Sequence, residues 1–263
     1  MDLGLAGRIA LVCGASRGLG AATARALARE GATVVLAARN RQALVELASS
    51  IWQETGQPTM VQPADLTRDE DVERLVAQAD ARFGRLDIVI TNCGGPATGR
   101  FADHDLDTWR RGVDLTLLSV VRLIRAALPS LRKSDAPSIL TFSSNSARQP
   151  VPNMVLANTL RLAVVGLTKT LALELGGEGI RVNSILPAWT MTERVGEILT
   201  DRAQRKGTSL EAEAEKQAEE SVFNRLGTPA EFARAATFLC SPAVPFMTGV
   251  MLPFDGGIYK GAL

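Results

Sequence analysis

The stretch from Arg8 to Ala28 reads RIALVCGASRGLGAATARALA and joins an apolar run to a glycine-rich turn and a helical pattern. The run before Gly14 is continuously apolar, which is typical of a strand buried on both faces of a parallel sheet. Gly14, Gly18 and Gly20 let a pyrophosphate approach the backbone, and the free N–H groups of a helix start attract its charge. We therefore expect a βαβ unit that binds a dinucleotide, rather than a tight turn without a ligand.

The same alternation of apolar runs and helical patterns continues along the chain. Strands are expected at residues 8–14, 32–39, 59–66, 86–95, 137–144, 180–188 and 249–257. Helices are expected at residues 18–30, 42–54, 69–83, 107–131, 153–175 and 229–239. No shift in composition separates a second domain. The sequence therefore predicts one α/β domain over residues 1–263, a doubly wound parallel sheet of about seven strands with helices on both faces.

Composition argues against several kinds of partner. Apolar residues make up 46% of the chain and charged residues 22%, as in ordinary globular proteins. The net charge of +1 gives no electrostatic basis for binding nucleic acid or an anionic membrane. No stretch reaches the ~20 uninterrupted apolar residues of a membrane span, and the first apolar run has no basic region before it. We expect no membrane segment and no secretory signal.

Cysteine usage indicates the compartment. Cys13, Cys93 and Cys240 lie in apolar segments and have no metal-ligand spacing. We interpret them as small buried side chains of a cytoplasmic protein, and we expect no metal site.

One charged segment interrupts the alternation of strands and helices. Residues 193–220, which include SLEAEAEKQAEE, are rich in Ala and Glu and follow the sixth expected strand. A solvated surface helix explains such a charge run. The segment also begins at the carboxyl end of a strand, so a lid over a substrate, within residues 190–224, is a second and compatible interpretation.

The second expected strand ends in LAARN and lacks the acidic residue that usually binds the ribose hydroxyls of NAD(H). Ala38 and Arg39 stand there instead, and Arg17 lies in the glycine loop. Two guanidinium groups suit a dianionic 2′-phosphate, because arginine can bind it through paired hydrogen bonds. We therefore expect NADP(H) in preference to NAD(H). Asp65, at the end of the third strand, is placed to reach the adenine.

Taken in order, the motifs resemble the short-chain dehydrogenase/reductase family, and most of all its 3-oxoacyl-carrier-protein reductase branch. The glycine spacing is joined by TNCGG, by a serine pair after the fifth strand, by RVNSILPA and by FDGG. The resemblance covers residues 5–257 and implies a Rossmann-type fold, a small carbonyl or alcohol substrate, and a homo-oligomer, tetrameric or dimeric. Together with the glycine loop it assigns the cofactor contacts to Gly14, Ser16, Arg17, Gly18, Leu19, Gly20, Arg39, Asn40, Asp65, Leu66, Asn92, Gly94, Arg161, Pro187 and Thr192.

The family's reductases use an asparagine, a serine, a tyrosine and a lysine, and the resemblance shows three departures from that set. The serine that polarises the substrate carbonyl matches Ser144. The asparagine position holds Asp114, the tyrosine position Ala157 and the lysine position Arg161. An ungapped match after Arg161 and the usual spacing from Ser144 to Ala157 fix the alignment. The only tyrosine of the chain is Tyr259, so the usual proton donor is missing.

The altered positions lead to two hypotheses. Asp114 and Arg161 are complementary in charge and could form an ion pair; independent drift of the two positions is the alternative. His104, the only histidine, could supply a proton, although an exposed loop histidine without a role is the simpler interpretation. Asn153 fits either a polar cleft or a helix cap.

Three functions remain open at this point. The first is an NADP(H)-dependent oxidoreductase with an altered route for the proton, which the intact glycine loop, Arg39 and Ser144 favour. The second is a cofactor-binding protein without turnover, acting as a sensor or as a subunit of a hetero-oligomer. The third is a lyase or isomerase that uses Asp114 or His104 as its base. Measuring cofactor binding, and then hydride transfer to a carbonyl, distinguishes these three functions.

Overall fold

The computed structural model describes residues 1–261, which form a seven-stranded parallel sheet of order β3-β2-β1-β4-β5-β6-β7. The strands are β1 (Ile9–Cys13), β2 (Thr33–Ala38), β3 (Thr59–Pro63), β4 (Ile88–Thr91), β5 (Ser138–Phe142), β6 (Arg181–Pro187) and β7 (Met251–Phe254). Val12 in β1 lies opposite Leu36 in β2 and Ile90 in β4, so β1 is a central strand. This architecture confirms the predicted doubly wound fold.

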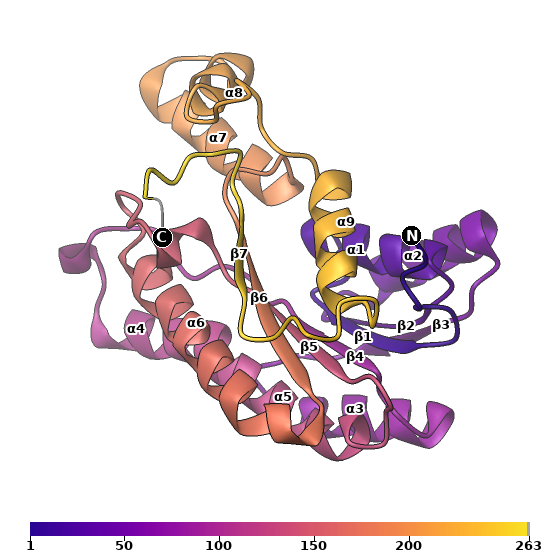
Figure 1. The fold of residues 1–263 in the computed structure, drawn as a ribbon. Coiled ribbons are helices and arrows are strands. Elements are labelled where there is room, and N and C mark those ends of the chain that lie inside the picture. The colour runs from indigo at the N-terminus through magenta and orange to yellow at the C-terminus, as the bar shows by residue number, and fades with distance from the viewer. Residues whose placement is uncertain (262–263) are drawn as a thin grey trace.

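Helices cover both faces of the sheet, and each face has its own apolar core (Figure 1). One face carries α1 (Gly18–Arg29), α2 (Arg41–Thr55) and α9 (Pro229–Cys240). The other carries α3 (Asp69–Phe83), α5 (Ser119–Leu131) and α6 (Val155–Leu175). Because successive strand side chains point to opposite faces, Leu11 enters one core and Val12 the other, and both must be apolar.

The long helix expected at residues 107–131 is broken in the structure. It consists of α4 (Leu106–Val113), a π-helical turn η2 (Asp114–Leu118) and α5. Such turns insert an extra residue and change the direction of side chains, often near functional sites. The helix expected from Asn153 begins at Val155, and Met154 precedes it without a side-chain cap. The cap interpretation of Asn153 is therefore wrong: this residue has φ 60° and its side chain accepts a hydrogen bond from Arg100.

Two short helices stand above the carboxyl edge of the sheet (Figure 1). They are α7 (Glu193–Lys206) and α8 (Leu210–Ala218), separated by Gly207 in the left-handed region at φ 68°. The segment that contains these helices is called the lid below, after its expected role. Its base is held together, because Met191 N–H donates to the Gly227 carbonyl (2.8 Å) and Gly227 N–H to the Trp189 carbonyl (3.1 Å). The 3-10 turns η1 (Phe101–Asp103), η3 (Asn145–Ala147) and η4 (Gly176–Glu178) complete the fold.

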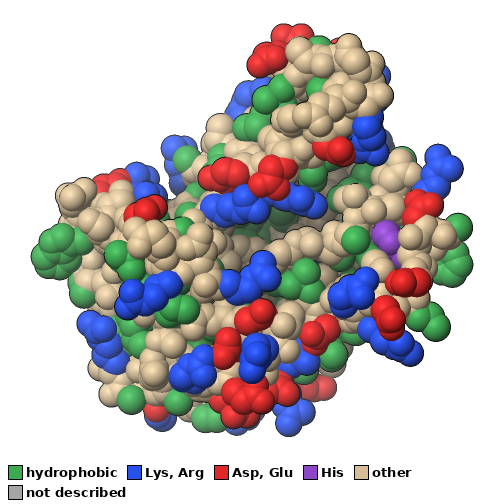
Figure 2. Space-filling model, turned by 180° about the vertical axis from the view of Figure 1, so that it is seen from behind, with side chains coloured by type: hydrophobic (Ala, Val, Ile, Leu, Met, Phe, Trp, Pro, Cys, Tyr) green, Lys and Arg blue, Asp and Glu red, His purple; other side chains and the backbone are tan. Residues whose placement is uncertain are grey.

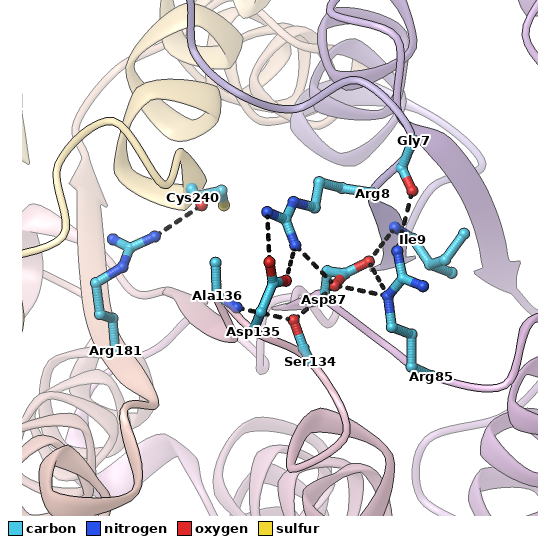
Figure 3. Close-up of polar contacts among 10 residues, drawn as sticks. All are labelled: Gly7, Arg8, Ile9, Arg85, Asp87, Ser134, Asp135, Ala136, Arg181 and Cys240. Carbon is cyan, nitrogen blue, oxygen red and sulfur yellow. Dashed lines mark hydrogen bonds and ion pairs between the residues drawn. The ribbon is translucent and has the colours of Figure 1, made fainter.

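At the opposite, amino edge of the sheet the side chain of Asp87 joins three chain segments (Figure 3). It is fully buried and accepts hydrogen bonds from Ile9 N–H (2.7 Å), Arg85 Nε (3.0 Å) and Ser134 Oγ (2.6 Å). Arg8 also pairs with Asp87, at 3.4 Å, and with Asp135. The starts of β1, β4 and β5 are therefore fixed to one buried carboxylate.

A second buried ionic group, the guanidinium of Arg181, closes the end of α9 (Figure 3). Arg181 is 7% exposed and donates to the carbonyls of Leu239 (3.0 Å), Cys240 (2.8 Å) and Ser241 (3.0 Å). These carbonyls lack partners within the helix, and a cation also complements the negative end of the helix dipole. Burial lowers the pKa of Arg181, but the guanidinium remains protonated at neutral pH.

The continuous stretch of α6 and η4, Val155–Glu178, is long and apolar enough to cross a membrane on length and composition alone. In this fold its inner face packs against the sheet, with Leu156, Leu160 and Val164 buried. Its outer face exposes Leu162 and Leu173. A helix that covers a sheet meets the same criterion without a membrane, so this composition does not by itself indicate one.

Replacing Arg181 tests the helix-end contact. Arg181→Met keeps an apolar stem but removes the donor to the carbonyls of Leu239 and Cys240, while that of Ser241 keeps Val244 N–H (3.4 Å). This loss should cost about 2–4 kcal/mol of unfolding free energy. Chemical denaturation followed by circular dichroism measures this loss. Arg234→Met, on the exposed face of α9, is the matched control and should change stability by less than about 0.5 kcal/mol. Equal stability of the two variants would contradict the role given to Arg181.

Candidate functional site

The glycine loop between β1 and α1 has space for a ligand because glycine carries no side chain. A Cβ atom on Gly20 would lie 2.2 Å from the Gly14 carbonyl oxygen, and one on Gly14 would lie 2.6 Å from Asn92 Nδ2. Gly14 also has φ 60°, a backbone conformation that glycine adopts without strain. Only glycine fits these two positions, so the loop keeps a bare backbone where β1 ends.

The start of α1 is prepared for an anion. Arg17 precedes the helix without forming a side-chain cap, and the first turn contains no acidic residue. The first N–H groups of a helix have no intrahelical partners, and the positive end of the dipole adds to their attraction for phosphate. The residues present therefore fit the pyrophosphate of a dinucleotide.

The predicted adenosine end contains a cation and a carboxylate. Arg39 is exposed directly after β2, while the side chain of Asn40 accepts from Ala43 N–H (3.1 Å) and caps α2. Burial alone would raise the pKa of Asp65, but hydrogen bonds from Thr67 and the charge of Arg39 lower it below the ordinary value. Arg39 and Asp65 thus lie within electrostatic reach of each other at this end of the cleft.

Arg17 forms an ion pair that the sequence did not reveal. Its Nη1 lies 2.7 Å from Glu197 Oε1 on α7, and this hydrogen bond holds the pKa of Glu197 below its usual range. Thr192 caps α7 by accepting from Val195 N–H, and it lies near Gly18. The first lid helix therefore contacts the glycine loop, and an arginine expected at the 2′-phosphate is shared with the lid.

Ser144 lies at the same edge of the sheet, just after β5. Its Oγ accepts a hydrogen bond from Ser146 N–H (3.1 Å) and donates to Asn145 Oδ1 (3.3 Å). The neighbouring Ser143 Oγ donates to the carbonyl of Arg161 (2.9 Å), which joins the strand end to α6. The Ser144 hydroxyl is half-buried, so a substrate can reach it.

Arg161 is held by main-chain carbonyls. It donates to the carbonyl of Phe142 (2.9 Å) and to that of Gly94 (3.4 Å), and its Nη1 is 4.0 Å from Cys93 Sγ. Within residues 1–261 no carboxylate pairs with it. The structure thus brings Ser144, Arg161 and Gly94 together where β4 and β5 end, while Pro187 ends β6 nearby in the sheet.

The expected ion pair between Asp114 and Arg161 is not formed. Asp114 Oδ1 lies 2.6 Å from Arg122 Nη1, and Arg122 also donates to Asp69 (2.7 Å). Burial alone would lower the pKa of Arg122, but the two carboxylates raise it. Asp114 and Arg122 are eight residues apart, about 12 Å along an ordinary α-helix. Helical ion pairs are usually three or four residues apart, so the spacing in the sequence did not indicate this pair.

His104 follows η1 and is half-buried beside Gly99, where a Cβ atom would lie 2.8 Å from its ring. Its Nε2 has no hydrogen-bond partner in the part of the chain that the structure describes. No contact joins it there to Ser144 or Arg161. Its role as a proton donor stays a hypothesis.

A cavity of about 780 Å³ lies beneath the lid, and its lining includes Asn145, the residue after Ser144. Asn145, Pro150 and Asn153 line one side, while Arg202 and Gln217 line the lid side. Figure 2 shows the molecule hollowed beneath the lid, with acidic and basic side chains around the hollow. The volume is within the range of small-molecule sites, so an organic molecule of substrate size fits in this cavity.

Known proteins resemble the chain over almost its whole length. Residues 14–259 match the family model described as enoyl-(acyl carrier protein) reductase. A short chain dehydrogenase/reductase, astE of Aspergillus oryzae, is 31% identical over 97% of this chain and 95% of that protein. L-sorbose reductase from Gluconobacter frateurii, solved with NADPH and L-sorbose, is 29% identical with a TM-score of 0.96, covering 99% of this chain and 100% of that one. An NADPH-bound short chain oxidoreductase from Pseudomonas aeruginosa PAO1 with an atypical catalytic centre is 29% identical with a TM-score of 0.88, over 97% and 98%.

The ion pair between Arg17 and Glu197 should compete with a 2′-phosphate. Glu197→Gln frees the guanidinium, so the affinity for NADPH should rise by roughly two- to fivefold while that for NADH stays unchanged. Calorimetric titration at low salt measures both affinities. Glu211→Gln is the matched control, since Glu211 is exposed on α8 and has no ion pair among the described residues. Unchanged or weaker NADPH binding by Glu197→Gln would show that Arg17 does not exchange partners.

Proposed function

Since the chain belongs to the short-chain dehydrogenase/reductase family of oxidoreductases, we propose that it is an NADP(H)-dependent enzyme with an altered route for the proton. Its substrate is a small carbonyl compound or the corresponding alcohol. One observation carries this proposal: the bare backbone cradle at Gly14 and Gly20 and the accessible hydroxyl of Ser144 lie on the same sheet edge. Two similar structures hold NADPH, which supports the proposed cofactor. One of them has an atypical catalytic centre, which supports an altered route for the proton.

NADP(H), when bound, supplies or accepts the hydride. Ser144 orients the substrate, because its oxygen already accepts from Ser146 N–H, which makes its own O–H a stronger donor. In the proposed mechanism that O–H turns from Asn145 to the substrate oxygen. The hydroxyl then polarises the carbonyl toward the incoming hydride.

Arg161 cannot relay a proton, because a guanidinium stays protonated in proteins. Two of its five N–H donors hold the carbonyls of Phe142 and Gly94, which leaves others for a ribose hydroxyl or the substrate oxygen. Because no carboxylate pairs with it within residues 1–261, its positive charge remains available to a developing oxyanion. We assign it this electrostatic role in place of the lysine's role in proton transfer.

The proton donor is the weakest part of the site. Ala157 is 8% exposed on the first turn of α6 and offers no acidic group. Loss of a positioned acid costs about 10²–10⁴ in rate, so turnover should be slow unless water or His104 supplies the proton. A cofactor-binding protein without turnover is therefore the second candidate. A lyase or isomerase using Asp114 is less favoured, because Arg122 occupies that carboxylate.

Three broader assignments belong to the proposal. We place the protein in the 3-oxoacyl-carrier-protein reductase-like branch. Three free cysteines, two of them fully buried, support a cytoplasmic location, and burial raises the pKa of the Cys240 thiol to about 12. Exposed apolar side chains on α6, Leu162 and Leu173, support a homo-oligomer.

The direct experiment follows NADPH oxidation with a panel of carbonyl compounds, using NADPH carrying deuterium at C4 of the nicotinamide. Transfer of deuterium to one face of a product carbon supports an oxidoreductase. Tight NADPH binding without transfer to any compound supports the second candidate.

Replacing Arg39 tests the cofactor preference. Arg39→Asp removes a cation and adds a carboxylate beside Asp65, so NADPH affinity should fall about 10- to 100-fold. NADH carries no 2′-phosphate, and its affinity should change little. Arg125→Asp, on the exposed side of α5, makes the same charge change far from the cleft and should leave both cofactors unaffected. An equal loss for NADPH and NADH would defeat the assignment of Arg39.

Restoring the family's residues tests the proton route. Ala157→Tyr with Arg161→Lys supplies an acid and a cation that lowers its pKa, so carbonyl reduction should rise by about 10²-fold or more. Ala157→Tyr alone should give a smaller gain. The comparison requires variants that fold and bind NADPH, as checked by melting and calorimetry. No gain in such a double variant would indicate a cleft rebuilt for another reaction.

A further inference from the structure

The cavity beneath the lid has a buried donor at its far end, the side-chain amide of Gln217 on α8. Gln217 is only 3% exposed and lines the cavity of about 780 Å³ together with Arg202. Its Oε1 accepts from Arg202 Nη1 (2.9 Å), and arginine can only donate, so the amide orientation is fixed. Nε2 is buried and lacks a hydrogen-bond partner within residues 1–261. A buried donor of this kind is costly unless a ligand satisfies it.

Two other amides of the same cavity also use their oxygen to accept from a neighbour, although Asn145 is half-buried and Asn153 is exposed. Asn145 Oδ1 accepts from Ser144 Oγ (3.3 Å), and Asn153 Oδ1 accepts from Arg100 Nε (3.1 Å). In both, the NH₂ group has no partner in the described chain. Three NH₂ donors therefore line one cavity, and of these residues Gln217 is the buried one. They fit a ligand with oxygen acceptors at several points along its length.

The charges of the cavity favour a neutral ligand. Four cations line it: Arg202, Arg205, Lys206 and Lys260. Three of them have carboxylate partners, because Arg205 pairs with Asp201, while Arg202 and Lys206 both pair with Glu213. Glu219 and Glu220 also line the cavity, so four carboxylates match the four cations. Exposed carboxylates accept hydrogen bonds from hydroxyl groups and repel carboxylate groups.

Trp189 gives the cavity one apolar surface. It lines the wall between the large cavity and a smaller one of about 190 Å³, and Gln217 lines both. The guanidinium of Arg202 lies 5.5 Å from its ring centroid, which fixes both side chains. An aromatic ring beside amide donors suits a molecule with C–H groups on one side and hydroxyls on the other.

We propose that the substrate is a neutral polyhydroxylated carbonyl compound, such as a sugar ketone or aldehyde, or the polyol formed from it. Gln217 binds an oxygen of this molecule remote from the reacting carbon, and Arg202 positions Gln217. The inference rests on the proposed function, since it names the substrate class for that same site.

The test measures binding rather than turnover. The protein saturated with NADP⁺ is titrated by calorimetry with straight-chain pentitols and hexitols, and with hexane-1,2-diol and hexanoate as poorly hydroxylated probes. At least one polyol should bind about tenfold or more tightly than either comparison compound. Gln217→Leu should weaken that polyol about tenfold, because its oxygen loses a buried donor. Gln217→Glu, which keeps the size but removes the NH₂ group, should weaken it as well.

Gln204→Leu is the matched control, because Gln204 is an exposed lid glutamine that does not line the cavity, and it should bind polyols as the wild type does. Hexanediol or hexanoate binding as tightly as the best polyol would overturn the proposal. So would wild-type polyol affinity in both Gln217 variants, or no polyol binding by protein that binds NADP⁺. Failure to bind NADP⁺ contradicts the proposed function instead, and titration of the cofactor-free protein then tests the cavity alone.

Discussion

The close approach of Asn92 to the glycine loop is the constraint on which the site depends. β1 and β4 are neighbours in the sheet, yet the chain leaves them toward opposite sides, so a crevice opens at their carboxyl ends. Asn92 Nδ2 donates to the Gly14 carbonyl (3.3 Å) across that crevice, and Gly20 packs against the same carbonyl. These contacts set where α1 begins, and therefore where its free N–H groups point. The places of Arg39, Ser144 and Arg161 around the crevice follow from the order of the strands.

Much of this arrangement could be predicted from local sequence. The strands are continuous apolar runs because both sheet faces are covered, and α3 has the expected bounds, with Gly84 in the left-handed region directly after Phe83. The elements that were not predicted depend on contacts between distant residues or on backbone geometry. The π-helical turn Asp114–Leu118 contains no glycine or proline that would indicate it in the sequence. The pairing of Arg17 with Glu197 joins residues 180 positions apart. Charge complementarity alone suggested Asp114 and Arg161 as partners, but complementarity does not supply distance, and Arg122 lies nearer.

The binding and chemical halves of the site have different characters. The dinucleotide half is built from backbone, where the absence of side chains is the requirement, and Gly14 and Gly20 would clash if enlarged. The chemical half depends on side-chain identity, and that is where the departures expected from the resemblance, Asp114, Ala157 and Arg161, fall. Arg161 illustrates the difference: main-chain carbonyls hold its guanidinium, so its position depends on the sheet and not on any acidic partner. A site of this kind can keep its cofactor while its proton chemistry changes.

The hydrogen bonds at the base of the lid have a consequence for how such a fold diversifies. Trp189, Met191 and Gly227 hold the two ends of the lid together at the sheet edge, independently of the helices between them. Because these ends are already joined, the entropic cost of a longer or shorter segment between them grows only slowly with its length. The segment between these ends can therefore be replaced as one unit that brings new helices and new polar groups over the cavity. The sheet and the dinucleotide crevice stay as they are. Recombination at the residues where these two ends meet would change what the protein recognises without refolding the rest.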